Sequence, residues 1–277
     1  MEVITAKTAG FCFGVERAVH TVTEEITKAK GPIYTYGPIV HNDLVVNSFA
    51  EQGVKVIGPD DIESLDGGTV IIRAHGVAEE VYRKLEKRNL TIVDATCPFV
   101  ARIHEIVHDS VNPVIIVGDP VHPEVVGIKG WSGGQAWVIG SIEDFNELRL
   151  PKNKQYTIVA QTTFNYEKFN EIVEKIKSFK YDIKCFNTVC NATQERQSEA
   201  ARVASNVDIM IVIGSKDSSN TKKLYDICKA HCKVTKFIQS VDDLNVKDLS
   251  YVERVGITAG ASTPNIIIEE VQTYVRS

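Results

Sequence analysis

The chain has 277 residues, of which 43% are hydrophobic and 24% charged, and its net charge is −5. This composition is typical of a globular protein and excludes a disordered or fibrous chain. The length suggests about two domains, and one or three would also fit. The acidic net charge argues against broad nucleic-acid binding. No apolar run approaches the roughly 20 residues of a membrane-spanning helix, and the N-terminus lacks a basic start followed by an apolar stretch, so we expect no secretory signal and a cytoplasmic protein.

Taken in chain order, the first third of the sequence predicts five segments. A strand leads through a turn and Cys12 into a helix, on which Val15, Val19 and Val22 recur on one face. The next strand ends in Gly, and the one after it runs into an acidic helix start. A fourth strand ends in a polar turn, and a helix follows. These segments are 3–22, 34–42, 54–65, 69–77 and 78–88.

The same order of segments recurs twice along the chain. Strands that alternate with helices in this way are typical of parallel sheets joined by right-handed crossovers. We therefore predict an α/β protein of three modules, each with a small, mainly parallel sheet. The second copy comprises 90–107, 114–124, 136–148, 156–164 and 166–179, and the third comprises 182–204, 210–220, 236–249, 255–263 and 264–277.

The third module lacks the strand that closes the other two, because the sequence stops after its last helix. The strand before Cys12 is the spare one, so we expect it to complete the third sheet. The predicted domains are residues 14–96, 97–189 and 190–277, with the strand in 1–13 added to the last. This arrangement closes a ring, a trefoil of three pseudo-threefold modules around a central site.

Three cysteines occupy the same place in the repeat. Cys12, Cys97 and Cys190 each lie between a strand and a helix, at intervals of 85 and 93 residues. Ligands of open parallel sheets bind beyond the carboxyl ends of the strands, so modules that face each other would bring these turns together. Small polar residues are common turn formers, but cysteines are not. The other polar residues at the strand ends are His41, His75, His122, Thr162, Thr163, Ser218, Ser219, Asn220 and Ser262.

Three converging thiols favour an iron–sulfur site. Backbone N–H groups and the helix dipole favour the thiolate form of a Cys that precedes a helix. A structural zinc is normally closed by four ligands, whereas three thiolates suit a [4Fe–4S] cluster with one iron open to substrate. Such an iron is a Lewis acid that can hold a substrate oxygen. The remaining cysteines, Cys185, Cys228 and Cys232, are predicted to be structural.

The polar side chains around these cysteines are mostly neutral donors at expected helix N-termini. Helix N-termini bind phosphates, and Arg73 and Lys216 are the nearest basic residues. A diphosphate held by neutral donors, helix ends and one or two protonated histidines fits this set. Glu124 follows His122 by two residues and is a suitable source of protons for a departing oxygen.

With these residues the chain resembles the 4-hydroxy-3-methylbut-2-enyl diphosphate reductase family over essentially its whole length. The resemblance implies a trefoil around an oxygen-sensitive [4Fe–4S] cluster. It also implies an activity of the non-mevalonate isoprenoid pathway, the reductive removal of the C4 hydroxyl of an allylic diphosphate, which gives isopentenyl and dimethylallyl diphosphates. The motifs that carry it are, in order, TAGFCFGVERAV, GPIVHN, RAHGV, DATCPFV, HPEVVG, QTT, NTVCNAT, GSKDSSNT and TAGAST.

The resemblance also implies a role for individual residues. Cys12, Cys97 and Cys190 match the family's cluster ligands, and Glu124 matches its proton donor. The implied electron donor is ferredoxin or flavodoxin, and no dinucleotide-binding fingerprint follows a strand in this chain. The implied substrate-binding residues are His41, His75, His122, Thr162, Ser218, Ser219, Asn220 and Ser262.

Two other functions compete with this interpretation. His104, Glu105 and His108 form an H-E-x-x-H motif, the signature of zinc hydrolases. The apolar face of their helix is predicted at Phe99, Ile103, Ile106 and Val107, which turns both histidines toward solvent, and no third ligand follows at the expected spacing. We therefore expect the motif to be a solvated face.

The second alternative is an iron–sulfur redox sensor that performs no turnover. A sensor would use the same three cysteines. It would need neither the diphosphate-binding residues nor Glu124, so the donor-rich surroundings of the cysteines favour the enzyme.

Overall fold

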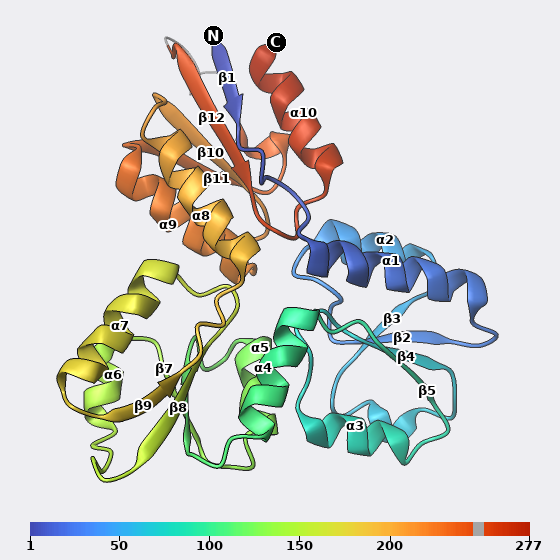
Figure 1. The fold of residues 1–277 in the computed structure, drawn as a ribbon. Helices are drawn as coiled ribbons and strands as arrows, with labels where there is room; N and C mark the ends of the chain where they lie inside the picture. Colours follow the sequence, from blue (N-terminus) through green and yellow to red (C-terminus); the bar gives the residue numbers. More distant parts are fainter. Residues whose placement is uncertain (246–251) are drawn as a thin grey trace. The chain divides into compact units, whose positions relative to one another are not determined.

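The computed structural model describes residues 1–245 and 252–277. It holds three four-stranded parallel sheets, so the predicted α/β class is confirmed (Figure 1). In spatial order, the first sheet comprises β3 (Lys55–Ile57), β2 (Ile33–Tyr36), β4 (Thr69–Ile72) and β5 (Thr91–Asp94). The second sheet comprises β7 (Ala136–Ile139), β6 (Val114–Val117), β8 (Gln155–Ala160) and β9 (Asp182–Cys185). The third sheet comprises β11 (Val234–Ile238), β10 (Ile209–Ile213), β12 (Arg254–Ala259) and β1 (Glu2–Thr5).

The chain folds into two compact units. Unit 1 contains residues 1–16, 40–47 and 191–277 and holds the third sheet, and unit 2 contains 17–39 and 48–190 and holds the first and second sheets. The limits of the three predicted domains and their arrangement as a ring remain predictions.

The helices of the described residues are α1 (Phe13–Lys28), α2 (Asp43–Glu51), α3 (Glu79–Glu86), α4 (Pro98–His108), α5 (Pro123–Trp131), α6 (Ile142–Glu147), α7 (Tyr166–Ser178), α8 (Asn191–Ala204), α9 (Ser219–His231) and α10 (Asn265–Arg276), with short 3₁₀ turns at Ile62–Ser64 and Val241–Asp243.

The three sheets share one strand order. Each has an edge strand, two central strands and a closing strand, and all neighbouring strands are parallel. In the first two sheets the closing strands, β5 and β9, follow the preceding helix along the chain. In the third sheet β1 takes this place and pairs with β12 from Glu2 opposite Arg254 to Thr5 opposite Ile257.

The central strands β6 and β10 are buried on both faces, which explains their unbroken apolar sequences. In β10, Ile209, Ile211 and Ile213 pack against α10, whereas Met210 and Val212 pack against α8 and α9. Figure 1 shows these helices on opposite faces of the third sheet. In the second sheet, alternate residues of β6 pack in the same way against α4 and α5 on one face and α6 and α7 on the other. The turns that follow β6 and β10 therefore start from strands that are packed on both faces.

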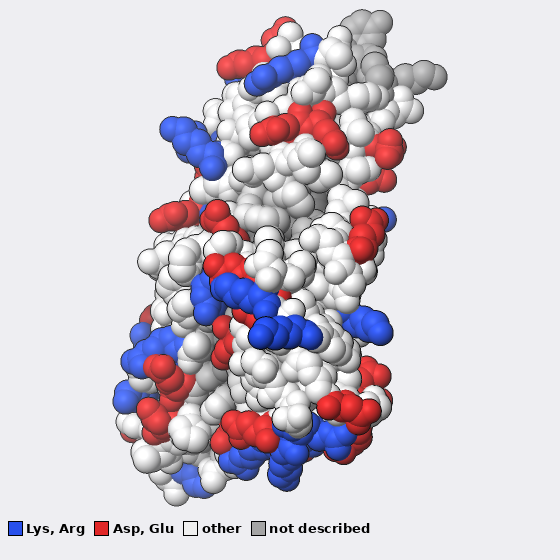
Figure 2. Space-filling view, turned by 90° about the vertical axis from the view of Figure 1, so that its right-hand side faces the viewer, with Lys and Arg blue, Asp and Glu red and all other residues white. Residues whose placement is uncertain are grey.

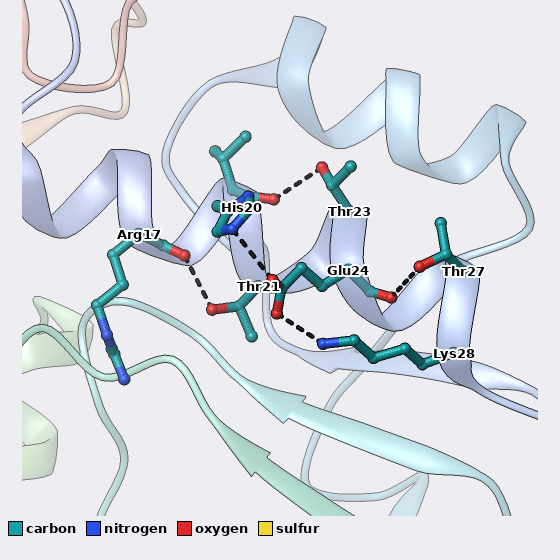
Figure 3. Close-up of polar contacts among 8 residues, drawn as sticks. Arg17, His20, Thr21, Thr23, Glu24, Thr27 and Lys28 are labelled. Carbon is teal, nitrogen blue, oxygen red and sulfur yellow. Dashed lines mark hydrogen bonds and ion pairs between the residues drawn. The ribbon is translucent and has the colours of Figure 1, made fainter.

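Charged residues of α1 form ion pairs on its solvent face. In α1, Glu24 accepts from Lys28 at 2.8 Å and His20 at 3.2 Å, one helical turn away on either side (Figure 3). Lys28 holds the pKa of Glu24 below its ordinary value. These side chains are largely exposed, so the pairs add little to stability. On the face drawn in Figure 2, Lys and Arg side chains lie among Asp and Glu side chains.

Two further sequence expectations, on membrane-spanning helices and on the third acidic helix start, can be compared with the structure. Among the described residues, none of the helices has the length and apolar character needed to span a membrane. The third of the acidic helix starts, predicted within 236–249, begins in β11 and continues into the 3₁₀ turn at Val241–Asp243. Its last four residues, 246–249, lie outside the described part of the chain.

Candidate active site

The three in-register cysteines share one backbone geometry. The N–H of each donates to the carbonyl found two residues after the end of a central strand, namely β4, β8 or β12. The repeat detected in the sequence is therefore a repeat of hydrogen bonding, and it fixes a thiol beside the equivalent strand end each time. The bonds join Cys97 N to Ala74 O at 3.0 Å, Cys190 N to Thr162 O at 3.0 Å and Cys12 N to Ala261 O at 3.2 Å.

A second repeated position lies five residues after the other central strand of each sheet. His41, His122 and Ser218 occupy it after β2, β6 and β10. His122 and Ser218 are the N-caps of α5 and α9, where His122 Nδ1 accepts from Glu124 N at 3.1 Å and Ser218 Oγ accepts from Thr221 N at 3.3 Å. Both side chains are thus held at a helix N-terminus, where backbone N–H groups favour an anion.

Glu124 is the buried acid of unit 2, with 1% of its surface exposed. Thr162 binds both carboxyl oxygens, because its N–H donates to Oε1 at 2.5 Å and its hydroxyl donates to Oε2 at 2.7 Å. The carbonyl of the same Thr162 accepts the N–H of Cys190. A carboxyl bound at both oxygens has one orientation, and the hydroxyl offers a short route for a proton.

Two histidines of unit 2 contact each other, and one of them, His122, binds the backbone of this acid. The ring centroids of His75 and His122 are 5.4 Å apart, and the rings meet edge to face at 79°. Since His122 Nδ1 accepts the N–H of Glu124, the proton of the neutral ring is assigned to Nε2. The structure therefore brings together His75, His122, Glu124 and Thr162, all of which the sequence had singled out.

Unit 1 has neutral hydrogen-bond donors after β10, at the positions that His122 and Glu124 occupy after β6. Asn220 is 5% exposed, and its Nδ2 has no hydrogen-bond partner among the described residues. A buried amide without an acceptor costs about 1–3 kcal/mol, a cost that the oxygens of an anion would remove. Ser218 and Ser262 are also buried, and Ser262 Oγ donates to the backbone oxygen of His41 at 3.0 Å. Ser219 begins α9 beside Asn220.

The six cysteines differ in burial, and none forms a disulfide. Cys12, Cys97 and Cys190 are half-buried, whereas Cys185 is exposed on β9. Cys228 and Cys232 are buried in the core of unit 1, and burial raises the pKa of Cys228 to about 12. A neutral buried thiol is a poor ligand. The half-buried set matches the three-thiolate donor set of a [4Fe–4S] cluster with one open iron.

The helix with the H-E-x-x-H motif does not have the predicted face. His104 is 6% exposed, so the expectation that both histidines face solvent is wrong for it, while His108 and Glu105 are exposed. Room for the imidazole comes from Gly76, where an added Cβ would lie 2.6 Å from its Cε1. Among the described residues, no group of three metal ligands includes either histidine. The buried residues of α4 are Val100, Ile103, His104 and Val107, and Phe99 is 47% exposed.

Sequence reasoning missed the contact that joins α5 to the turn carrying His75. Trp131, the last residue of α5, donates from Nε1 to the carbonyl of Val77 at 2.8 Å. Gly130 faces Ala78 so closely that a side chain there would collide with it. The only sign of this contact in the sequence is the pair Gly127 and Gly130 before Trp131, because residues without side chains let another segment approach α5 closely.

Comparisons with known proteins cover the whole chain. The family model described as LytB protein matches residues 3–276. A relative from Caldanaerobacter subterraneus subsp. tengcongensis is 42% identical over 282 residues, which are 100% of this chain and 97% of the relative. One from Geobacter sulfurreducens is 44% identical over 275 residues, 98% of this chain and 95% of the relative. Both bear the name 4-hydroxy-3-methylbut-2-enyl diphosphate reductase.

Two solved structures are similar along nearly the whole chain. One is described as (E)-4-hydroxy-3-methyl-but-2-enyl diphosphate reductase, the terminal enzyme of the non-mevalonate pathway. It is 41% identical, has a TM-score of 0.72 and covers 100% of this chain and 99% of its own. The other is the E-1-hydroxy-2-methyl-but-2-enyl-4-diphosphate reductase from Plasmodium falciparum, which is 30% identical, has a TM-score of 0.90 and covers 99% and 87%.

Proposed function

The chain belongs to the LytB protein family, and from this membership we propose that it reduces 4-hydroxy-3-methylbut-2-enyl diphosphate to isopentenyl and dimethylallyl diphosphates. The C4–O bond breaks, two electrons and two protons enter, and the oxygen leaves as water. Relatives of that name support the substrate and the reaction. The observation that carries the chemistry is the buried Glu124, bound at both oxygens by Thr162 beside His122.

The three in-register thiols would hold the cofactor. Cys12, Cys97 and Cys190 are half-buried and tied by their N–H groups to equivalent strand ends. When bound to them, a [4Fe–4S] cluster supplies electrons and an open iron that is a Lewis acid toward the substrate hydroxyl. We expect the electrons to come from ferredoxin or flavodoxin, and the reaction to take place in the cytoplasm.

Neutral donors would hold the diphosphate. Asn220 offers the amide hydrogens of Nδ2, and the first turn of α9 adds its N–H groups and the hydroxyls of Ser218 and Ser219. The predicted binding set is completed by His41, His75, His122 and Ser262. Because few of these groups carry a full charge, they bind a compact diphosphate in a fixed position without holding its products too tightly.

Glu124 would supply the proton that lets the oxygen leave as water. Its carboxyl cannot rotate while Thr162 holds both oxygens. The Thr162 hydroxyl can accept a proton from the acid as it donates its own to the substrate oxygen. Thr162 therefore acts both to orient the acid and to pass on its proton.

Anaerobic purification followed by iron and acid-labile sulfide analysis tests the proposal. We expect about four of each per chain and consumption of the allylic diphosphate with a chemical reductant. A redox sensor would hold the cluster but leave the diphosphate unchanged. Zinc without sulfide would contradict the reductive mechanism. Glu105→Gln serves as a control, because Glu105 is an exposed acid on α4 and pairs only with Arg102 among the described residues.

A further inference from the structure

We propose that a cavity between α3, α4 and α5 in unit 2 binds a small organic cation, an alkylammonium. The proposed reductase reaction does not use this site. The cavity has a volume of about 320 Å³, which lies within the range of small-molecule sites. Its lining contains carboxylates and aromatic rings but no Lys or Arg: the residues are Tyr82, Asp94, Thr96, Ala101, His104, Glu105, His108, Asp109 and Trp131.

Aromatic rings gather around Trp131. The centroid of its indole ring lies 5.4 Å from that of His104, nearly parallel to it at 18°, and 6.0 Å from that of Tyr82 at 62°. His108 meets the indole edge to face at 5.9 Å. The indole N–H is already donated to Val77 O, so Trp131 contributes π surface to the cavity. Trp and Tyr faces attract cations that come within about 6 Å of the ring centroid.

Asp94 supplies a carboxylate beside these rings. Its Oδ2 accepts from the Tyr82 hydroxyl at 2.8 Å, and its Oδ1 accepts from Thr96 N at 2.8 Å. Burial raises the pKa of Tyr82, so the phenol keeps its proton and donates it to Asp94. Each carboxylate oxygen retains a lone pair, and the rim of the cavity adds a second carboxylate, Asp109, at the end of α4.

The histidine in the wall of the cavity adds no positive charge. Burial lowers the pKa of His104 to about 4, so the ring is neutral under physiological conditions. Its Nε2 makes no hydrogen bond within the described part of the chain, which is uncommon for a buried polar atom. A neutral ring stacked on Trp131 extends the aromatic wall without repelling a cation.

Cationic side chains near the rim are engaged elsewhere. Arg17 donates to the backbone oxygens of Thr96 at 2.8 Å and Asp94 at 3.2 Å, and Arg102 pairs with Glu105 at 2.7 Å. No ion pair is found for the carboxylates of Asp94 and Asp109 among the described residues. The cavity therefore combines an aromatic wall with two unneutralised acids, which is the chemistry that selects an alkylammonium over a neutral molecule of the same shape.

Tryptophan fluorescence can test the site directly, because the chain has two tryptophans. In a Trp137→Phe background only Trp131 reports. Choline is titrated against its neutral isostere 3,3-dimethyl-1-butanol, with sodium chloride controlling for ionic strength. We expect a saturable change with choline and none with the isostere. Equal responses to both, or no saturable response to choline, would overturn the proposal.

Charge variants separate a specific site from general attraction to an acidic protein. Asp94→Asn should weaken choline binding at least tenfold and Asp109→Asn about threefold. Asp226→Asn removes an equal charge from an exposed position of α9 and should change nothing. If Asp94→Asn fails to fold, Asp109→Asn still decides, because its side chain is exposed. Identical affinities in the Asp109 and Asp226 variants would contradict the proposal.

Discussion

The two units place different chemistry at equivalent positions of one repeat. Seven residues after β6, unit 2 has Glu124, and seven residues after β10, unit 1 has Asn220; both are buried second residues of a helix. The acid is bound at both oxygens by Thr162, whereas the Nδ2 of the amide finds no acceptor among the described residues. The same backbone thus presents a carboxyl with bound oxygens in one unit and an amide without an acceptor among the described residues in the other.

This difference shows how a buried site can be prepared for its ligand. An acid buried in the folded chain needs its partners at all times, because an unpaired buried carboxyl is costly. An amide that is completed only by the ligand loses its desolvation cost when the ligand binds, and this relief adds to the binding free energy. We therefore propose that the site residues of unit 2 are positioned before substrate binds, and that the donors of unit 1 are satisfied by the substrate itself.

The largest effect is expected from replacing the proposed cluster cysteines, which come from both units. Cys12→Ser in unit 1 and Cys97→Ser in unit 2 should both lose iron and all turnover, because each removes one of three thiolates. Cys185→Ser changes an exposed thiol and should retain about four irons per chain. Iron analysis of anaerobic preparations measures this. A Cys12→Ser protein with full iron content would exclude unit 1 from the cluster site.

Exchanging the acid for an amide makes unit 2 resemble unit 1. Glu124→Gln should keep the cluster and lower turnover by about 10²- to 10⁴-fold, the usual contribution of a general acid. Asp43→Asn is the matched control, since Asp43 lies seven residues after β2 and is exposed. Steady-state kinetics with iron analysis measures both. Wild-type turnover in Glu124→Gln would remove the acid from the mechanism.

The corresponding change in unit 1 should act on binding. Asn220→Ala removes donors that only the ligand satisfies, so KM should rise about ten- to hundredfold while kcat changes less. Asn206→Ala, a surface amide that donates to Arg202 O, should leave both constants unchanged. A fall in kcat with an unaltered KM would show that Asn220 acts on the reaction step and would break the proposed division of roles.

The smallest expected effect is the loss of folding stability at acidic pH that His104 of unit 2 causes. The pKa of His104 is lowered from 6.5 to about 4, so the unfolded state binds the proton more tightly. The free energy of unfolding is therefore highest above about pH 6.5 and falls as the pH drops toward 4, by about 2 kcal/mol at pH 5 through this group. Urea unfolding at pH 7.5 and pH 5 measures the loss.

His104→Gln should lose this part of the pH dependence, and His108→Gln, an exposed change on the same helix, should retain it. Equal pH dependence in the His104→Gln protein and the unaltered chain would mean that other groups titrate on unfolding. Cys228 in unit 1 has a pKa raised to about 12 and cannot contribute in this range.

The strand ends could be predicted from sequence because their signal is local. Central strands such as β6 and β10 are short apolar runs that end in Gly, and the turns after them carry polar residues at fixed offsets. The in-register cysteines marked the repeat, and the structure shows the hydrogen bonds behind it. The contact between Glu124 and Thr162, 38 residues apart, was not predicted, since no spacing rule gives it.

The face of α4 could not be predicted, because it depends on what packs against it. Counting apolar residues put Phe99 on the buried face, although it is 47% exposed, and turned His104 outward. The imidazole is buried because Gly76 and Gly127 leave space beside it. Which helix meets which glycine is a property of tertiary packing, and the pattern of one helix does not contain it.

The pairing of β1 with β12 has a consequence for how the protein is made. On the ribosome, β1 is synthesised about 250 residues before its partners, which begin at Arg254. Until then the strand has no neighbour, and the third sheet cannot close before β12 has been synthesised. Contacts of such long sequence separation form slowly, and an unpaired β12 exposes a strand edge that promotes aggregation. A tag or truncation at the N-terminus should therefore affect the yield of soluble protein more than one at a surface loop.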